Sequence, residues 1–590
     1  LAAACRTALP PPRAEAPPAA PDQATARAFL DTLQQRTFEF FWETTPAGNG
    51  LTPDRWPTPS FSSIAAVGFA LSAYLVGVEN GWITRDEAAG RTLATLRFFW
   101  EAPQGDQPAE VTGYRGFFYH FLDMETGHRF ETVELSTIDT TLLLAGILSA
   151  QVYFDGADGR EREIRALADS IYLRVDWPWA QARPPSVSMG WRPERGYVPA
   201  DWRGYNEAMI LLILALGSPT HPIGPESWHE WTSTYRWGSF YGEEHLGFAP
   251  LFGQQYSHVW IDFRGIQDSV MRHHGIDYFE NSRRATVDQR AYAIDNPDEW
   301  RGYGPNIWGL TACDGPADTT LMVDGRPREF HTYWARGAGP FDVQDDGTIA
   351  PTAAGGSIPF APEMAVPALF EMRHRFGDHL WGEYGFRDAF NLTFDDAGIP
   401  PEKGTVVPGV GWFDVDYLGI DQGPIVLMIE NHREAFLWDL MKQSPYVVTG
   451  LCRAGFRGGW LAGRCGEGAA AVAGRDAALV DSLLGLMTLD EKLGQLAQYS
   501  ARWNPELHAP EATPEHLEMV REGRVGSFLS LYGAELLREL QRVAVEESRL
   551  GIPLLFAQDV IHGFRTVFPV PLAEAATWDP EAVERAARVA

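Results

Sequence analysis

The sequence is poor in positive charge and in cysteine. Its 590 residues include 48 lysines and arginines against 78 aspartates and glutamates, for a formal net charge of -30. Such a chain is a poor partner for nucleic acid or for an anionic membrane surface. Apart from Cys5, the cysteines Cys313, Cys452 and Cys465 are too few and too scattered for a zinc site or a disulfide framework. We therefore expect packing to supply the stability, with no metal and no cofactor.

Long apolar runs are also missing. The most apolar segments, residues 142–150 and 209–216, are too short to span a bilayer. At 590 residues, however, the chain exceeds what one hydrophobic core usually serves. The sequence therefore predicts two or more domains and no transmembrane helix.

The first residues have the features of an export signal. Leu-Ala-Ala-Ala-Cys at residues 1–5 resembles the end of a bacterial lipoprotein signal, and the Pro/Ala-rich segment 10–21 that follows is typical of a flexible tether. The alternative is a chance cysteine after alanines. We expect residues 1–24 to be a signal remnant and tether, and the protein to be periplasmic or anchored to the outer membrane. Contact with a membrane would then occur only through a lipid on Cys5.

Residues 25–461 are predicted to be mainly α. Apolar positions recur at helical spacing, whereas strand-like alternation is sparse. The segments with this spacing are 29–42, 64–78, 86–100, 136–153, 161–174, 206–216, 265–278, the surroundings of 292–294, 362–376 and 422–441. About a dozen helices with long loops fit a toroid of two concentric helical rings whose loops build a cleft at one end. An α-solenoid is the alternative, but the chain lacks the fixed repeat that solenoids need.

The stretch 204–222 defines the predicted site most clearly. Asn206 and Glu207 come at the first turn of a predicted buried helix, which Gly217 and Pro219 end. Asp139, Asp314, Asp421 and Glu363 also stand at junctions between loops and helices. Taken singly, acids at such positions are more often helix caps or loop anchors. Together they would converge on one end of a toroid.

Convergent acids suit glycoside hydrolysis. That reaction needs one protonated carboxyl group to assist the leaving oxygen and one ionised group to activate water or attack carbon. Glu207 is the candidate acid, because nearby aromatic residues would raise the pKa of its carboxyl. Asp421 is the candidate base, because the start of a helix favours an anion. Asp139 completes the predicted catalytic set.

Aromatic residues make up 12% of the chain and include 21 tryptophans. Flat apolar faces suit sugar rings, although about half of these residues would be needed for packing alone. The predicted substrate-binding residues, each of which is also a candidate for simple packing, are Tyr119, His120, Tyr205, His258, Trp260, Asp262, Arg264, Trp308, Asp314 and Glu363.

Several strings resemble a known family. Residues 63–71 (SIAAVGFAL), 136–140 (STIDT), 204–209 (GYNEAM), 216–222 (LGSPTHP) and 419–424 (GIDQGP) resemble the glycoamylase-type domain of glycoside hydrolase family 144. The resemblance implies an α/α six-hairpin toroid and an inverting endo-β-1,2-glucanase that releases sophoro-oligosaccharides. It also implies that the functional acids fall on Asp139, Glu207 and Asp421.

After residue 461 the composition changes. Residues 462–475 are rich in Gly and Ala and are predicted to be a linker. Residues 476–590 resemble the start of a glycoside hydrolase family 3 β-glucosidase, with the strings 487–496 (MTLDEKLGQL), 558–563 (QDVIHG) and 568–580 (FPVPLAEAATWDP). The resemblance implies a truncated β/α-barrel in which Asp559 holds hydroxyls of a terminal glucose. An endo-glucanase joined to such a module would pass it oligosaccharides.

Other functions remain open on the residues alone. A glucoamylase-like α-glucan hydrolase would share the fold and the reaction class, and a non-catalytic glycan-binding lipoprotein would share the aromatic cleft. A polysaccharide lyase usually needs a basic site, which this acidic chain disfavours. A terpene cyclase would use an acid pair such as Asp414 and Asp416, but further acids do not follow them. The favoured partner is therefore a β-glucan polysaccharide or oligosaccharide.

Overall fold

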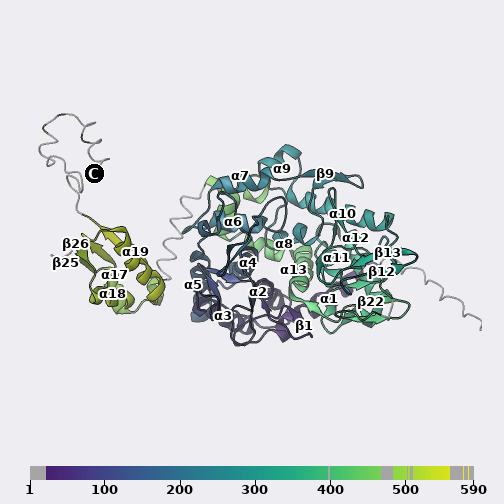
Figure 1. Cartoon of the computed structure of the whole chain (residues 1–590), viewed down its shortest axis with the longest axis horizontal. Helices are drawn as coiled ribbons and strands as arrows, with labels where there is room; N and C mark the ends of the chain where they lie inside the picture. Colours follow the sequence, from purple (N-terminus) through teal and green to yellow (C-terminus); the bar gives the residue numbers. More distant parts are fainter. Residues whose placement is uncertain are drawn as a thin grey trace, which may run out of the picture. The chain divides into compact units, whose positions relative to one another are not determined.

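The chain folds into two compact units, Leu1–Ala471 and Val472–Ala590 (Figure 1). The computed structural model describes residues 21–395, 399–466, 483–500, 502–504, 509–558, 576, 578 and 583. The division between the units falls in the stretch that the sequence predicts to be a linker. Cys5 and the predicted tether lie outside the described residues, apart from the tether's last position, Pro21.

The first unit is built from helices arranged in pairs. Its α-helices are α1 (Gln23–Thr44), α2 (Ile64–Glu79), α3 (Arg85–Glu101), α4 (Thr137–Tyr153), α5 (Gly159–Leu173), α6 (Met209–Gly217), α7 (Pro225–Ser233), α8 (Phe252–Trp260), α9 (Ser269–His274), α10 (Tyr278–Asp295), α11 (Pro351–Gly355), α12 (Pro362–Phe376), α13 (Gly419–Glu434), α14 (Phe436–Met441) and α15 (Pro445–Arg453).

The helices form two rings. The inner ring contains α2, α4, α6, α8, α11 and α13, and the helices that pack against them from outside include α1, α3, α5, α10, α12 and α15. All nine residues of α6 are buried, and α2 is buried from Ile64 to Gly77, as expected for helices that are apolar on every side. By contrast, α5 buries only one stripe, which includes Ile164, Ala168 and Ile171. The prediction of an α/α toroid is confirmed.

Two glycines let inner helices α2 and α4 touch through their backbones. A Cβ added at Gly68 would lie 2.2 Å from the carbonyl oxygen of Leu142, and one added at Gly146 would lie 2.1 Å from the carbonyl oxygen of Gly68. Because no side chain fits in either place, these positions require glycine. The close approach fixes how α4 sits beside α2.

The loops carry many short strands, which the sparse alternation did not predict. A five-stranded antiparallel sheet has the order β3-β4-β6-β7-β8, and a four-stranded sheet has the order β17-β20-β22-β21. The strands of the first unit are β1 (Arg55–Trp56), β2 (Ser62–Ser63), β3 (Gly113–Tyr114), β4 (Phe117–Tyr119), β5 (Phe121–Leu122), β6 (Leu135–Ser136), β7 (Gly190–Arg192), β8 (Gly196–Tyr197), β9 (Trp237–Phe240), β10 (Glu243–Leu246), β11 (Ala312–Cys313), β12 (Thr319–Val323), β13 (Arg326–Phe330), β14 (Trp334–Ala335), β15 (Gly337–Ala338), β16 (Val343–Gln344), β17 (Thr348–Ile349), β18 (Trp381–Gly382), β19 (Gly385–Phe386), β20 (Phe390–Asn391), β21 (Thr405–Val407), β22 (Gly411–Phe413) and β23 (Tyr417–Leu418).

Four of these strands lead into inner helices. β2 runs directly into α2, β6 into α4 and β23 into α13, while β17 ends two residues before α11 begins. The sheets are therefore gathered where the inner helices start. Side chains in the first turns of α4 and α13 face this end of the toroid, which is where the sequence places Asp139 and Asp421.

Three local predictions differ from the structure. The helix expected at residues 206–216 begins at Met209, so Glu207 lies in a turn before it. The helix expected at residues 265–278 is only the short α9, which ends at Gly275 in the left-handed conformation with φ of 70°. The stretch between the helices expected at 206–216 and 265–278, for which no helix was predicted, contains α7, the hairpin β9–β10 and α8.

The cysteine prediction was wrong. Cys452 at the end of α15 forms a disulfide with Cys465, thirteen residues later. The helix end and the following turn bring the two together, which the wide scatter of cysteines in the sequence did not indicate. Cys313 is a buried free thiol.

The second unit has the mixed character expected for the start of a β/α-barrel. Its strands β24 (Gln498–Ser500), β27 (Ser527–Leu529) and β28 (Leu555–Ala557) form a parallel sheet, and β25 (Arg502–Asn504) pairs with β26 (Ala509–Glu511). Its α-helices include α17 (Leu489–Gln495), α18 (Pro514–Arg521) and α19 (Ala534–Arg542). Among the described residues of both units, no helix is long and apolar enough to cross a membrane.

Candidate active site

Asp139 sits in the first turn of α4 beside a histidine. Ser136 caps this helix, and its hydroxyl donates a hydrogen bond to Oδ2 of Asp139. The Nε2 atom of His120 lies 3.5 Å from the same oxygen, while its Nδ1 atom lies 3.0 Å from Glu134. Burial alone would lower the pKa of His120, but the charges of Asp139 and Glu134 raise it to about 9. A positively charged imidazole therefore lies against the Asp139 carboxylate.

Glu207 occupies the turn just before α6. Ser257 of α8 fixes this turn, because its hydroxyl donates to the Glu207 carbonyl at 3.0 Å and accepts from the amide of Ile210 at 3.1 Å. The Oε2 atom of Glu207 is buried and has no hydrogen-bond partner. Burial, with a smaller contribution from the charge of Asp139, raises the pKa of Glu207 to about 7. This carboxyl group is therefore poised to hold a proton near neutral pH.

Asp421 lies in the first turn of α13 and is 3% exposed. Burial raises the pKa of its carboxyl to about 8, and the negative charges of Asp314 and Asp54 contribute in the same direction. The sequence led us to expect the opposite direction from the helix dipole. Burial outweighs the dipole here, and it also outweighs a side-chain hydrogen bond with Asp388, which lowers the pKa of Asp421.

The charges of all three acids affect the pKa of the Tyr256 hydroxyl. Tyr256 comes from α8, is 7% exposed and donates to the carbonyl oxygen of Ile420 at 3.2 Å. Burial is the main cause that raises the pKa of this hydroxyl well above its usual range. The charges of Asp421, Glu207 and Asp139 raise its pKa further. The charges of all three carboxyl groups therefore act on this one hydroxyl, as expected for groups that face the same end of the toroid.

A second group of acids adjoins Asp421. Asp314, Asp414 and Asp416 each place one carboxylate oxygen within 4.8 Å of the others, an arrangement that is able to hold a metal ion. The guanidinium of Arg55 lies among them, since its Nη1 atom is paired with Asp314 and is 3.6 Å from Oδ2 of Asp416. Its Nε atom is 3.4 Å from Asp54. Arg55 thus supplies positive charge to this acidic group.

The sequence did not single out all of these residues. Arg55 and Asp54 reach the site because β1 pairs with β23, which places Arg55 opposite Leu418 immediately before α13. Asp388 accepts a hydrogen bond from the amide of Asp314 at 2.7 Å, and burial raises the pKa of Asp388 well above its usual range. The only sequence signal was the pair Asp414 and Asp416, which we had set aside as a faint likeness to cyclases.

Four predicted substrate-binding aromatics are core residues. Trp260 is fully buried, stacks on Phe69 and donates to Ser72, and Trp308 is fully buried in a second apolar cluster. Tyr119 is fully buried, under the guanidinium of Arg129. Tyr205 is 2% exposed and stacks on an internal tyrosine. Since none of the four presents a ring to solvent, we do not assign them to substrate contact.

Three further predicted residues lie towards the other end of α13. Lys442, which follows α14, is 2.8 Å from Asp262, and the guanidinium of Arg264 lies 4.2 Å from the ring of Trp438 in α14. The carbonyl oxygen of His258 also accepts from Trp438. A 16-residue helix such as α13 is about 24 Å long, so Asp262 and Arg264 are far from Asp421 in its first turn, whereas His258 follows Tyr256 by two residues in α8 and lies between the two ends. Their type and spacing in the sequence did not reveal on which end they would fall.

Two more predictions have different outcomes. Glu363 is exposed at the start of α12 and lies 4.0 Å from Arg283, with none of the site acids among its contacts. Asp559 lies outside the described residues. Of the predicted set, the structure thus brings together Asp139, Glu207, Asp421, His120 and Asp314.

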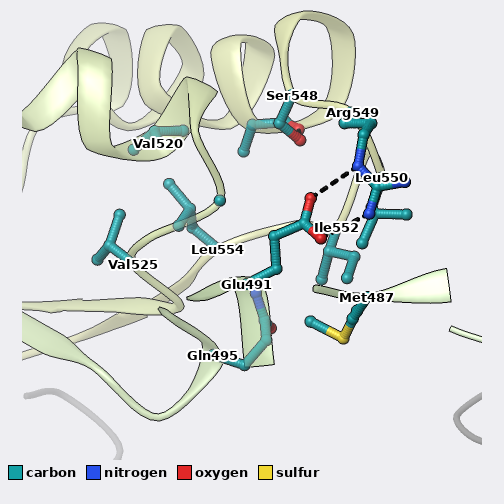
Figure 2. Close-up of a pocket in the computed structure, with 12 residues that line it drawn as sticks. Met487, Glu491, Gln495, Val520, Val525, Ser548, Arg549, Leu550, Ile552 and Leu554 are labelled. Carbon is teal, nitrogen blue, oxygen red and sulfur yellow. Dashed lines mark hydrogen bonds and ion pairs between the residues drawn. The ribbon is translucent and has the colours of Figure 1, made fainter. Parts of the chain in front are cut away.

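The second unit has a small pocket of its own (Figure 2). Glu491 of α17 forms two hydrogen bonds with Arg549, at 2.9 and 2.5 Å, and this pairing lowers the pKa of Glu491 to about 2. Apolar side chains that include Met487, Val525 and Leu554 line the rest of the pocket. The ion pair fills the polar part of the hollow, so its evident role is to join α17 to the segment after α19.

Comparisons with known proteins identify both units. The family model described as "Putative glucoamylase" matches residues 199–445, and the model of the glycosyl hydrolase family 3 N-terminal domain matches residues 488–590. A curated relative, the exo-β-1,2-glucooligosaccharide sophorohydrolase of Parabacteroides distasonis, is 30% identical over 464 residues. That match covers 72% of this chain but only 58% of the relative. A periplasmic β-glucosidase of Salmonella typhimurium is 40% identical over 116 residues, which are 20% of this chain and 14% of that protein.

Solved structures agree with these matches. A crystal structure from Bacteroides uniformis that bears the same glucoamylase description is 32% identical, with a TM-score of 0.63, and the match covers 75% of this chain and 100% of that one. The endo-β-1,2-glucanase of Chitinophaga pinensis is 28% identical, with a TM-score of 0.62, over 74% of this chain and 99% of that one. The chain therefore belongs to the glycoamylase family, of the glycoside hydrolase family 144 type, and carries a glycoside hydrolase family 3 N-terminal segment after it.

Proposed function

We propose that the first unit hydrolyses β-1,2-linked glucan to sophoro-oligosaccharides. The proposal is supported by the positions of Asp139, Glu207 and Asp421 at or just before the starts of α4, α6 and α13, and by the effect of all three charges on the hydroxyl of Tyr256. The β-1,2 linkage is supported by the names of two relatives, the sophorohydrolase and the endo-β-1,2-glucanase. As this chain spans little more than half of the first relative, the linkage calls for a direct assay.

Glu207 acts as the general acid in this proposal. With its pKa raised to about 7, close to half of the Glu207 carboxyl groups carry a proton at neutral pH, although an ordinary glutamate would be ionised. The unpartnered Oε2 atom can donate that proton to the glycosidic oxygen as the bond breaks. The departing sugar then leaves as a neutral alcohol.

Asp421 acts as the general base. It accepts a proton from the water that attacks the anomeric carbon, so it must be ionised when substrate is bound. With a pKa raised to about 8, the ionised fraction of Asp421 grows as the pH rises through neutrality. Attack by water on the face opposite the leaving group inverts the anomeric configuration. Asp139, held by Ser136 and His120, is the acid placed to bind a sugar hydroxyl.

The mode of cleavage is a separate part of the proposal. We propose endo cleavage, although the two named relatives include an exo-acting and an endo-acting enzyme. Endo cleavage lowers the viscosity of long linear glucan early and releases a ladder of products. Release of sophorose alone from the start of the reaction would show exo cleavage instead.

A second candidate is an α-glucan hydrolase, which the glucoamylase description of the matching family favours. The full chain should be incubated in parallel with linear β-1,2-glucan and with starch, and the first products followed by proton NMR. The proposal expects cleavage of β-1,2-glucan with an α-anomeric first product. Cleavage of starch alone would show that the substrate is an α-glucan. A β-anomeric first product from β-1,2-glucan would show that the mechanism is retaining and would leave the substrate class unchanged.

We also propose that the protein works outside the cytoplasm, as a periplasmic or lipid-anchored protein. The disulfide between Cys452 and Cys465 is typical of oxidising compartments, and the β-glucosidase relative is named as periplasmic. Metabolic labelling with a fatty acid should mark the natural protein and not its Cys5→Ser variant. In that compartment, a family 3 module would use the oligosaccharides that the first unit releases.

A further inference from the structure

A small hollow of about 70 Å³ lies beside the acidic group of the first unit. Two separate loops line it, one contributing residues 314–315 and 332–333 and the other contributing Glu402 and Lys403. Pockets for drug-sized ligands have volumes of about 300–1,000 Å³, so this hollow is too small for an oligosaccharide and holds at most one sugar ring. The carboxyl of Asp314 belongs both to this pocket and to the acids around Arg55.

Tyr333 offers an aromatic surface in this pocket. The side chain is 48% exposed, unlike the core aromatics discussed above. Burial and the charges of Asp421 and Asp54 raise the pKa of the Tyr333 hydroxyl well above its usual range. Tyr333 therefore shares the pocket with Asp314, within reach of the charge of the candidate base, while about half of its surface stays exposed. An aromatic ring with one apolar face and one polar tip is suited to stack on a sugar.

Lys403 offers hydrogen-bond donors on the other loop. Its ammonium lies 3.7 Å from Oδ2 of Asp314, a distance that allows attraction but exceeds a hydrogen bond. The Lys403 side chain is 29% exposed, whereas that of Asp314 is only 3% exposed. The ammonium hydrogens thus remain able to bind a hydroxyl that enters the pocket. Lys403 is one of three lysines in the whole chain.

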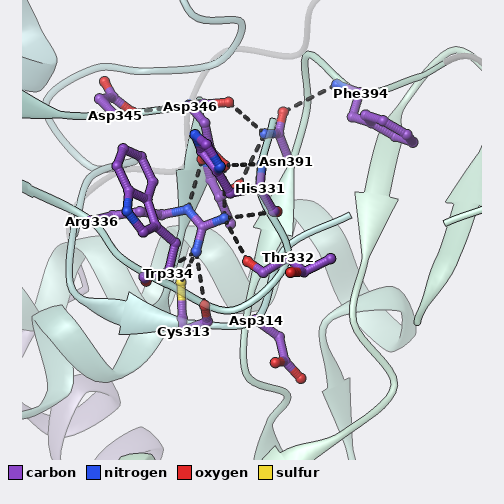
Figure 3. A network of polar contacts seen from close by, with 12 residues as sticks. Cys313, Asp314, His331, Thr332, Trp334, Arg336, Asp345, Asp346, Asn391 and Phe394 are labelled. Atoms are coloured by element: carbon purple, nitrogen blue, oxygen red, sulfur yellow. Dashed lines mark hydrogen bonds and ion pairs between the residues drawn. The ribbon is translucent and has the colours of Figure 1, made fainter. Parts of the chain in front are cut away.

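Arg336 holds the first loop in place (Figure 3). The fully buried guanidinium makes a two-pronged ion pair with Asp346, with both hydrogen bonds at 2.7 Å. It also donates to the carbonyl oxygens of Cys313 at 2.8 Å and of His331 and Thr332 at 3.1 Å. One side chain therefore ties the strand that leads to Asp314 to the segment that carries Tyr333.

Gly315 packs against this arrangement. A Cβ added there would lie 2.2 Å from Nη2 of Arg336 and 2.2 Å from the carbonyl oxygen of His331. Because the second contact is to backbone, the loop would have to move to admit even an alanine. The pocket wall is thus rigid before any ligand arrives, which lowers the cost of ordering it on binding.

We propose that this pocket is a sugar subsite next to the bond that is cleaved, in which Tyr333 stacks on a glucosyl ring, Lys403 donates to its hydroxyls and Arg336 positions the loop. The proposal rests on the proposed function, because it assigns the pocket to a unit of the same glucan. It adds two residues that contact substrate and one positioning residue to the acids described above.

Kinetics on linear β-1,2-glucan test the contact residues in the full chain. Tyr333→Ala and Lys403→Met should each raise KM by about tenfold and change kcat by less than about threefold, since they remove ground-state binding. The matched controls are Tyr241→Ala, an equally exposed tyrosine at 43%, and the exposed Lys492→Met in the second unit. KM values of both pocket variants equal to those of the controls would overturn the subsite.

A binding measurement separates this proposal from the proposed function. Sophoro-oligosaccharides are titrated by calorimetry into Glu207→Gln and into the double variant Glu207→Gln/Tyr333→Ala. A Kd about tenfold weaker in the double variant supports the subsite even if the wild-type chain fails to turn over β-1,2-glucan. Equal Kd values, or absence of binding to either protein, overturn it.

The positioning role of Arg336 has its own readout. Arg336→Lys keeps a positive charge but cannot reach three carbonyl oxygens and Asp346 together. We expect KM to rise as in Tyr333→Ala, and we expect the double variant Arg336→Lys/Tyr333→Ala to add little further. If the KM effects multiply, the two residues act independently and the positioning role is wrong. Gly315→Ala is the second probe, with a similar KM rise expected from loop movement.

Discussion

The Nε2 atom of His120 lies 3.5 Å from Oδ2 of Asp139 at the start of inner helix α4. These two residues come from opposite sides of the loop between β4 and β6, and the pairing of Tyr119 with Leu135 brings them together. The contact makes Asp139 part of a charged pair at the rim of the candidate site. It also leads to a prediction about stability.

The first prediction concerns the pH dependence of unfolding. A histidine whose pKa rises from 6.5 to about 9 on folding adds stability that is complete below pH 6.5 and is lost as the pH passes 9. His120→Gln should therefore lower Tm most near pH 6 and least above pH 9.5. The control is the exposed His273→Gln. A Tm difference for His120→Gln that is the same at every pH would contradict the charged pair.

The second prediction separates the acid from the base. An aryl β-sophoroside with a nitrophenolate leaving group departs without a proton, so Glu207→Gln should keep much of its activity on this substrate. On natural glucan the same variant should lose about 10²–10⁴-fold in kcat. Asp421→Asn should lose activity on both substrates. If Asp421→Asn, and not Glu207→Gln, is the variant that keeps aryl activity, the two roles are reversed.

The pH profile is a companion to that test. Activity requires the protonated form of Glu207, whose population falls as the pH rises above about 7. It also requires the ionised form of Asp421, whose population grows as the pH approaches about 8. A bell-shaped profile with its maximum between pH 7 and 8 is expected. If the roles of Glu207 and Asp421 were reversed, the profile would be a bell over the same pH range. The pH profile therefore tests which groups titrate, and the aryl substrate tests which of them is the acid and which the base.

The third prediction concerns Arg55. Its guanidinium is 12% exposed and pairs with buried carboxylates, so Arg55→Met would leave those charges uncompensated. We expect a loss of about 3–5 kcal/mol in the free energy of unfolding, measured in urea. Arg97→Met is the control, because the Arg97–Glu163 pair is exposed and should contribute less than about 1 kcal/mol. Equal losses would mean that Arg55 does not balance the acids.

The fourth prediction concerns the disulfide. A bridge that closes a loop of thirteen residues is expected to stabilise the folded first unit by about 3 kcal/mol. Dithiothreitol should therefore lower the Tm of the wild-type protein. In the variant Cys452→Ser/Cys465→Ser, the Tm should already be low and should not respond to the reductant. A wild-type Tm that is unchanged by dithiothreitol would show that the disulfide does not contribute to the stability of the first unit.

The sequence was informative where a pattern is local. The helical spacing of apolar residues predicted the toroid, and the acids that precede or open inner helices, Glu207, Asp139 and Asp421, could be named from their strings. Their chemistry was less accessible. The raised pKa of Asp421 comes from burial among other acids, and burial is a property of the assembled fold rather than of one helix.

The sequence failed where distant segments meet. Arg55 joins the acids because β1 pairs with β23 more than 350 residues later, and no local pattern records that pairing. Trp260 and Trp308 stand in aromatic-rich strings but point into the core, since a composition rich in rings does not say which rings face a ligand. Tyr333, which remains exposed beside the acids, stands next to Trp334 in a similar aromatic string, and the sequence did not indicate which of these rings would stay exposed.

The most direct test of the central claim is the turnover of linear β-1,2-glucan by Glu207→Gln beside the wild-type chain, with reducing ends counted over time. If the carboxyl groups of Asp139, Glu207 and Asp421 perform hydrolysis, the wild type releases reducing sugar and the variant is slower by about a hundredfold or more. Equal rates in the two proteins would show that this site does not cleave glucan.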